Sequence, residues 1–216
     1  MKKILTVLFG LVLAASPLSS GLTSVQAQDA DIMQKAQERF KNMETLEADV
    51  VMTKHNTMVT KDVTSKGKFY FKKPSKMTMS FNEGADLLLM DGQTFTMVKD
   101  GKKQTMSGNG NSQLEALKTL LQNFSAGQES EVDLSDIADV DMERNGDLVV
   151  ITVTPIVTDA KQKRKMMFTS FVVTVNTKKS ELKTVRMNEK GENYTEYEFS
   201  NFKVNGNVPD AVFVAK

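Results

Sequence analysis

The feature that most constrains the fold of this chain is a series of short segments in which apolar and polar residues alternate. The segment at residues 46–53 shows the pattern, because Leu46, Ala48, Val50 and Met52 occupy every second position. A period of two places alternate side chains on opposite faces of a β-strand. Asp-Gly and Asn-Gly pairs, which favour tight hairpin turns, join several of the segments. Connections this short join antiparallel neighbours, so an antiparallel sheet is predicted.

About six such segments precede residue 112 and about five follow residue 127, on the alternation and turn signals alone. The expected strands are 46–53, 67–71, 77–81, 85–90, 95–97, 102–106, 140–144, 148–154, 166–175, 182–187 and 194–204. The stretch 128–137 is acidic and matches neither period. No internal repeat and no low-complexity linker divides the chain.

Two segments show the helical period instead. In residues 29–43, Met33, Ala36 and Phe40 recur at three- and four-residue steps. In residues 112–127, a capping-box pattern at Ser112 precedes a second apolar stripe. Both stripes must be buried against something, and the concave face of a large curved sheet would cover both. We therefore expect an α+β fold, in which helices cover the open concave side of a strongly curved antiparallel sheet.

The N-terminus has the pattern of a secretory signal peptide over residues 1–27. Lys2 and Lys3 precede an apolar run at residues 4–15, and Val25-Gln26-Ala27 has the small residues of a cleavage site. The apolar run is shorter than the roughly 20 residues that a bilayer span needs. Cleavage would leave residues 28–216 as a single secreted domain; the alternative is an uncleaved N-terminal anchor.

Composition removes several classes of function. The chain has 28 basic and 27 acidic side chains, so it lacks the basic excess of a nucleic-acid binder. It has no Cys and a single His, His55, which argues against thiol catalysis, zinc thiolates and multi-histidine metal sites. His55 is expected at the surface. We expect no catalytic residue, no metal, no cofactor and no enzymatic activity.

A basic run at residues 161–165 has two interpretations. Four of its five positions are Lys or Arg. Most such runs are solvated turns, but a run like this can also contact an acidic partner or anionic lipid headgroups.

The apolar positions of the expected strands and of the second helix form one candidate binding surface. Its residues are Phe69, Phe71, Met77, Met79, Phe81, Leu87, Leu89, Phe95, Met97, Leu117, Leu121 and Phe124. The chain has 14 Met residues, and unbranched, polarizable Met side chains adapt to ligands of varying shape. From the residues alone, the surface is either a cavity for a flexible apolar ligand or a plain packed core.

One stretch of the sequence has a specific order of parts. Gly67 is followed by an aromatic strand, Lys72-Lys73-Pro74, another strand, an acidic turn at Glu83 and then Asp91-Gly92. This order resembles the periplasmic outer-membrane lipoprotein carrier (LolA-like) family. The resemblance extends to the second helix, the Asn145-Gly146 hairpin and the late strand at residues 194–202.

The resemblance implies an incomplete antiparallel barrel of about eleven strands, with an apolar cavity under closing helices. It implies a periplasmic carrier that takes acylated lipoproteins or lipids from an inner-membrane lipoprotein-releasing transporter to an outer-membrane acceptor. We expect the protein to be a monomer. In the family an Arg precedes the motif's proline and bonds to the helical lid. Lys73 occupies that position here and is the candidate latch; the alternative is a solvated lysine beside Lys72. The alternative is a periplasmic regulatory module that senses lipids or lipoproteins with the same half-barrel.

Overall fold

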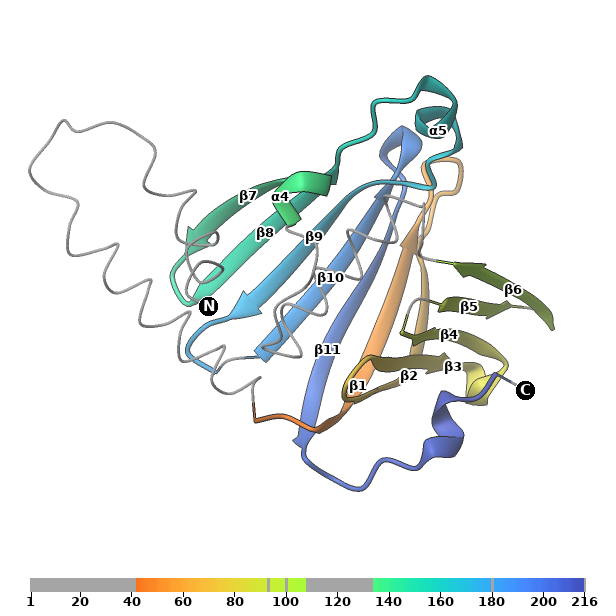
Figure 1. The fold of residues 1–216 in the computed structure, drawn as a ribbon, viewed down its shortest axis with the longest axis vertical. Helices are drawn as coiled ribbons and strands as arrows, with labels where there is room; N and C mark the ends of the chain where they lie inside the picture. Colours follow the sequence, from red (N-terminus) through yellow and green to blue (C-terminus); the bar gives the residue numbers. More distant parts are fainter. Residues whose placement is uncertain (1–41, 93, 100, 108–133, 180, 216) are drawn as a thin grey trace, which may run out of the picture.

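The strands of the computed structural model form an antiparallel sheet. The structure describes residues 42–92, 94–99, 101–107, 134–179 and 181–215. Within them, eleven strands belong to one sheet (Figure 1). The strands are β1 (Thr45–His55), β2 (Val63–Lys72), β3 (Lys76–Phe81), β4 (Asp86–Asp91), β5 (Thr94–Lys99), β6 (Lys102–Ser107), β7 (Ala138–Asn145), β8 (Leu148–Pro155), β9 (Phe168–Asn176), β10 (Glu181–Glu189) and β11 (Tyr194–Val204).

The helical elements that the structure describes are short. They are α4 (Leu134–Ile137), α5 (Ala160–Lys165) and the 3₁₀ turns η1 (Asn82–Gly84), η2 (Lys190–Glu192) and η3 (Asp210–Phe213). In the described part of the chain, no helix has the length and apolar character needed to cross a membrane.

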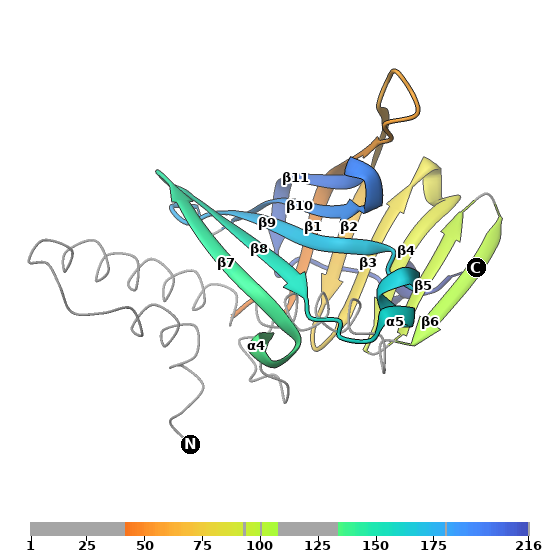
Figure 2. The ribbon, with the colours of Figure 1, turned by 90° about the horizontal axis from the view of Figure 1, so that it is seen from above.

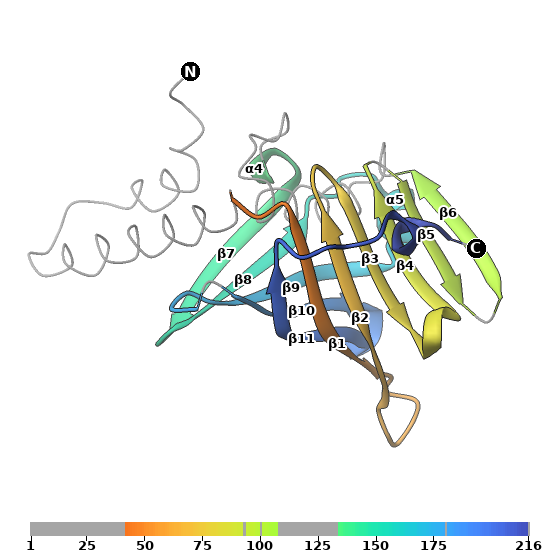
Figure 3. The same ribbon diagram turned by 90° about the horizontal axis from the view of Figure 1, so that it is seen from below.

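The sheet consists of two meanders joined at its centre. The strand order is β6-β5-β4-β3-β2-β1-β11-β10-β9-β8-β7, so β1 pairs with β11 while β6 and β7 lie at opposite edges. The sheet is open and strongly curved (Figures 2 and 3). Because all neighbours are antiparallel, residues directly opposite each other share a face. The register alone therefore decides which side chains meet on the concave face.

Most of the core lies on that concave face. Ala48 and Val50 of β1 are almost completely buried, as are Phe171 of β9 and Phe199 of β11. Both meanders contribute to this one continuous cluster. A second, smaller cluster lies on the other face and is described below.

Gly67 shows how one residue of β2 permits this packing. Gly67 is paired with Phe81 of β3, and a Cβ at Gly67 would overlap both the Ser80 carbonyl oxygen and the Phe81 ring. Glycine is therefore required if Phe81 is to lie over β2.

The predicted antiparallel sheet is confirmed, with six strands before residue 112 and five after residue 127. The basic run at residues 161–165 forms a helix, α5, although a loop was expected. The Asp159 side chain caps it, because Oδ1 accepts hydrogen bonds from the Lys161 and Gln162 backbone amides at 2.9 and 2.8 Å.

The expected signal peptide at 1–27, nearly all of the helix at 29–43 and the helix at 112–127 lie outside the described residues. The prediction that helices cover the concave side therefore remains a prediction.

Candidate functional site

An apolar hollow lies on the concave face where the two meanders meet. It is lined by Phe69, Met77, Met79, Leu88, Met90, Phe95, Leu182, Val185, Met187, Tyr197 and Phe199. The cavity volume of the hollow is only about 30 Å³, far below the roughly 300–1,000 Å³ of small-molecule sites. An apolar ligand could therefore enter it only if the lining side chains moved apart.

The register of the first meander explains five neighbouring lining residues. Phe69 of β2 lies opposite Met79 of β3, which lies opposite Leu88 of β4. Two residues further along β4, Met90 lies opposite Phe95 of β5. Side chains opposite each other in an antiparallel pair are close neighbours, so these strands present a continuous apolar wall.

The second meander provides the facing wall. Val185 of β10 lies opposite Tyr197 of β11, and Met187 lies one alternate position further along β10. The Phe69 and Phe199 rings meet edge to face, with their centroids 5.2 Å apart. The two walls are thus in contact at the sheet centre, although Phe69 and Phe199 are 130 positions apart in the sequence.

The hollow offers almost no polar chemistry. Apart from the sulfur atoms of the Met residues, the hydroxyl oxygen of Tyr197 is the one side-chain atom in the lining that is not carbon or hydrogen. Burial, together with the smaller effect of the negative charge of Glu189, raises the pKa of Tyr197 to about 12. The phenol is therefore neutral at physiological pH, and no charged side chain lines the hollow. Such a surface suits hydrocarbon better than a polar metabolite.

Some expected site residues lie where the alternation placed them. Phe69, Met77, Met79 and Phe95 line the hollow. Phe71 and Phe81 share its face and are buried in the adjoining core. Met97 is opposite Leu88 in the register, so it shares this face and lies beside the hollow.

The placement of Leu87 and Leu89 in the cavity was wrong. Both lie on the opposite face of β4, where Leu89 packs with Val208 and Phe213. Residues 87–90 are apolar without interruption, so alternation could not decide their faces. The pairing of β3 with β4 decides the faces: Phe81 lies opposite Asp86, so Met79 lies opposite Leu88 and Met77 lies opposite Met90. Leu88 and Met90 therefore share the face of Met77 and Met79 and line the hollow.

Besides Leu88 and Met90, five lining residues, all in the second meander, were not predicted: Leu182, Val185, Met187, Tyr197 and Phe199. Their strands were expected, and Val185 and Met187 alternate in the sequence. Their meeting with Phe69 depends on the pairing of the first strand with the last, which no local signal encodes. Leu117, Leu121 and Phe124 lie outside the described residues.

Lys73, the candidate latch, lies where β2 meets the segment that leads into β1. Its backbone amide donates to the Glu44 carbonyl oxygen at 2.9 Å, and its Nζ lies 3.3 Å from Glu44 Oε1. Only 18% of the Lys73 side chain is exposed. These contacts hold Lys73 against the segment that follows the expected first helix. Its role as a latch stays a prediction.

Ionisable groups elsewhere were considered as sites. Within the described ranges, no group of three or more His, Asp or Glu side chains could hold a metal ion. His55 ends β1, half-buried: its Nδ1 lies 2.7 Å from Asp62 Oδ1, and its ring stacks on Tyr194 at 4.9 Å between centroids.

Residues 41–216 match the sequence profile of the family described as outer membrane lipoprotein carrier protein LolA. No curated protein sequence matches the chain.

Among solved structures, a DUF1329 family protein from Desulfovibrio piger aligns with a TM-score of 0.45 at 15% identity, over 85% of this chain and 95% of that one. A LolA superfamily protein from Nitrosomonas europaea aligns with a TM-score of 0.41 at 13% identity, over 85% and 96%. The Pseudomonas aeruginosa MucA/MucB complex gives 0.43 at 12% identity, over 86% of this chain and 60% of that one.

Proposed function

This chain belongs to the LolA family of outer membrane lipoprotein carriers, and we propose that it carries acylated lipoproteins or lipids with their acyl chains held in the hollow. In this proposal the secreted domain, residues 28–216, works in the periplasm as a monomer. It receives its cargo from an inner-membrane lipoprotein-releasing transporter and passes it to an outer-membrane acceptor. It acts by binding and release, without breaking a bond.

The observation that carries the proposal is the chemistry of the hollow. Four of its lining residues are Met: Met77, Met79, Met90 and Met187. Met side chains repack around ligands of different shape, which suits acyl chains that vary in length. With Tyr197 neutral and no charge in the lining, the free energy of binding would come from burial of hydrocarbon.

Energetics limit how much of the cargo the hollow can hold. Burial contributes roughly 0.8 kcal/mol per methylene. Two fully buried chains of about 16 carbons would contribute on the order of 25 kcal/mol, beyond the roughly 18–21 kcal/mol at which non-covalent affinities saturate. A carrier that must release its cargo should therefore bury the chains only in part, or alternate between states of different acyl affinity. Lys73 is the candidate residue for biasing one such state.

Uptake of a fluorescent fatty-acyl probe tests whether the hollow binds acyl chains. Met79→Glu places a charge in the hollow, and Leu182→Trp fills it from a half-buried position. Met142→Glu makes the same change as Met79→Glu at an exposed position of β7 and is the matched control. We expect both hollow variants to lose probe binding, whereas the control keeps it. Equal binding by Leu182→Trp and the wild type, with both folded, would contradict the proposed site.

Release of lipoproteins from inner-membrane spheroplasts tests the transport step. The purified protein should release lipoproteins, and Met79→Glu should not. Probe binding without release, while a known carrier works in parallel, would exclude transport. The regulatory module that senses lipids would then be the better description.

A further inference from the structure

Three connections form a row along one end of the sheet, at the top of Figure 1. They are the β1–β2 loop within residues 54–63, the β8–β9 connection with α5 within residues 159–167, and the β10–β11 hairpin within residues 189–193. We call these three segments the loop end. The β1–β2 loop projects beyond the rest of the sheet (Figures 2 and 3).

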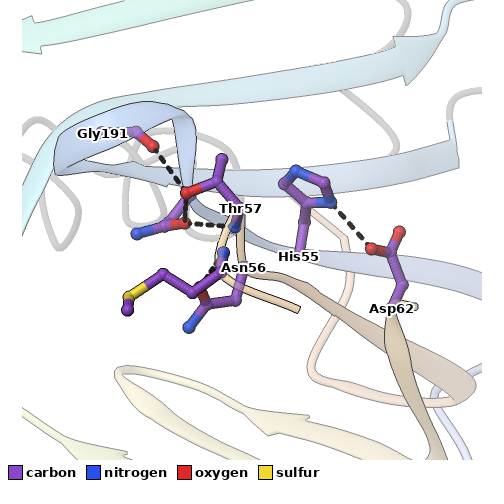
Figure 4. Close-up of polar contacts among 7 residues, drawn as sticks. His55, Asn56, Thr57, Asp62 and Gly191 are labelled. Carbon is purple, nitrogen blue, oxygen red and sulfur yellow. Dashed lines mark hydrogen bonds and ion pairs between the residues drawn. The ribbon is translucent and has the colours of Figure 1, made fainter. Parts of the chain in front are cut away.

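Hydrogen bonds join the three segments into one surface. The Thr57 backbone amide donates to Asn193 Oδ1 at 2.9 Å, and Thr57 Oγ1 donates to the Gly191 carbonyl oxygen at 3.4 Å (Figure 4). Lys190 Nζ donates to the Arg164 carbonyl oxygen at 2.7 Å. The β10–β11 hairpin therefore braces the β1–β2 loop on one side and α5 on the other.

The tip of the β1–β2 loop is apolar and held in one turn. Met58 is 90% exposed and Val59 is 52% exposed. The Met58 amide donates to Asn56 Oδ1 at 2.9 Å and the Val59 amide donates to the Asn56 carbonyl oxygen at 3.0 Å. Four of the nine exposed large apolar side chains in the described residues belong to the loop end, and these are Met58, Val59, Val63 and Met167.

The loop end also concentrates positive charge. Its three segments contain seven basic and four acidic side chains, whereas the whole chain has a formal net charge of only +1. Four of the basic residues lie in α5, and all four are exposed: Lys161, Lys163, Arg164 and Lys165. Among the acids, Asp62 lies against His55 and Asp159 caps α5. The net charge exposed here is therefore positive.

We propose that the loop end docks on the surface of a bilayer that contains anionic lipids. Met58 and Val59 would enter the headgroup region, while the Lys and Arg side chains of α5 contact lipid phosphates. A bilayer has its anionic groups outside an apolar interior, which matches a protruding apolar tip flanked by cations. An acidic protein surface would match the charges but would also need a pocket for the tip. The proposal does not depend on the function of the hollow.

A fluorophore at the tip tests insertion directly. The chain has no Cys, so Met58→Cys provides a single site for an environment-sensitive dye. Vesicles of phosphatidylcholine and phosphatidylglycerol at 7:3 should shift the dye emission to the blue and raise its intensity at least two-fold at low salt. Vesicles of phosphatidylcholine alone should give a smaller response. The control label, Met142→Cys on exposed β7, should respond little. Equal responses at both positions, or none at position 58, would overturn the proposal.

Charge reversal tests the contribution of α5. Each basic side chain near an anionic surface contributes roughly five-fold in affinity. The double variant Lys163→Glu and Lys165→Glu should therefore weaken vesicle binding more than ten-fold. The matched control, Lys178→Glu and Lys179→Glu, makes the same charge change in the turn at the other end of β9. Equal losses in the two pairs would mean that only the overall charge matters, against a defined docking surface.

Measuring acyl-probe uptake and vesicle binding in the same variants separates this proposal from the transport function and from binding to a protein partner. The α5 and tip variants should keep acyl-probe uptake, whereas Met79→Glu should keep vesicle binding. Loss of both properties in every variant would indicate misfolding of the variants, which circular dichroism checks. If the protein binds envelope proteins at the loop end but no vesicles, the partner is a protein and the membrane proposal is wrong.

Discussion

The two faces of β2–β4 are both apolar, but they are used differently. On the concave face, Met77 and Met79 border a hollow that keeps empty space. On the convex face, Leu89 packs against Val208 and Phe213 of the C-terminal segment. An ion pair between Lys72 Nζ and Asp210 Oδ1, 2.7 Å apart, lies beside that contact. Apolar character alone therefore does not identify a binding surface; what matters is whether another part of the chain covers it.

The largest expected effect is a loss of stability when the packing on the convex face is removed. Phe213 is 5% exposed, and Phe213→Ala removes one of the two buried residues that pack with Leu89. Phe→Ala changes in cores cost about 3–5 kcal/mol, so we expect a loss near the lower end of that range, since a terminal segment can relax. Urea denaturation measures it. The folded variant should retain acyl-probe binding, because the hollow is on the other face; loss of binding would show that the faces are coupled.

A smaller effect on the concave side should depend on pH. Burial raises the pKa of Tyr197 to about 12, above its usual value near 10. The stability that this shift represents is complete below about pH 10 and is lost as the pH rises towards 12, because only the unfolded chain ionises there. The loss should be on the order of 2–3 kcal/mol. Stability curves against pH for the wild type and Tyr197→Phe should diverge only above pH 10; parallel curves would show that the phenol is not buried.

A gain in the free energy of unfolding of about 1 kcal/mol is expected when Thr78, which lies beneath the convex cluster, is replaced. Thr78 is fully buried, and within the described residues its Oγ1 has no hydrogen-bond partner. Leaving a buried hydroxyl unpaired costs about 1–3 kcal/mol. Thr78→Val keeps the shape and removes that cost, so it should raise the free energy of unfolding by about 1 kcal/mol. Thr96→Val is the control, since Thr96 Oγ1 lies 3.2 Å from Thr105 Oγ1; a gain in both variants would point to β-propensity instead.

The smallest effect concerns the polar part of the convex face. A hydrogen bond from Lys203 is the largest cause that lowers the pKa of Glu47, and one from Lys68 lowers the pKa of Asp49. Lowered carboxyl pKa values stabilise the fold above their usual range, and this stability is lost as the pH falls below about 4. Because these groups are exposed, solvent screening keeps the effect small. Lys68→Met should make acid unfolding slightly less steep, and added salt should have the same effect. If Lys68→Met leaves the dependence of stability on pH below about pH 4 unchanged, these ion pairs do not contribute to stability.

Much of the sheet could be predicted because its signals are local. Alternation over residues 46–53 and 77–81 assigned the buried faces of β1 and β3, and Asp91-Gly92 marked the turn after β4. The assignment failed at Leu87 and Leu89, where four apolar residues in a row contain no period. It also failed at α5, where the Asp159 cap outweighed a composition typical of a loop.

By itself, the sequence determined the number of strands, their antiparallel pairing with neighbours and the apolar face of most of them. These properties depend on side-chain alternation and turn residues a few positions apart. Only the tertiary structure decided that β1 pairs with β11, which brings Val185 and Tyr197 to Phe69 and Met79. That pairing joins residues more than a hundred positions apart, so it reflects the global balance of burial and chain entropy. No short stretch of residues contains the information needed to predict it.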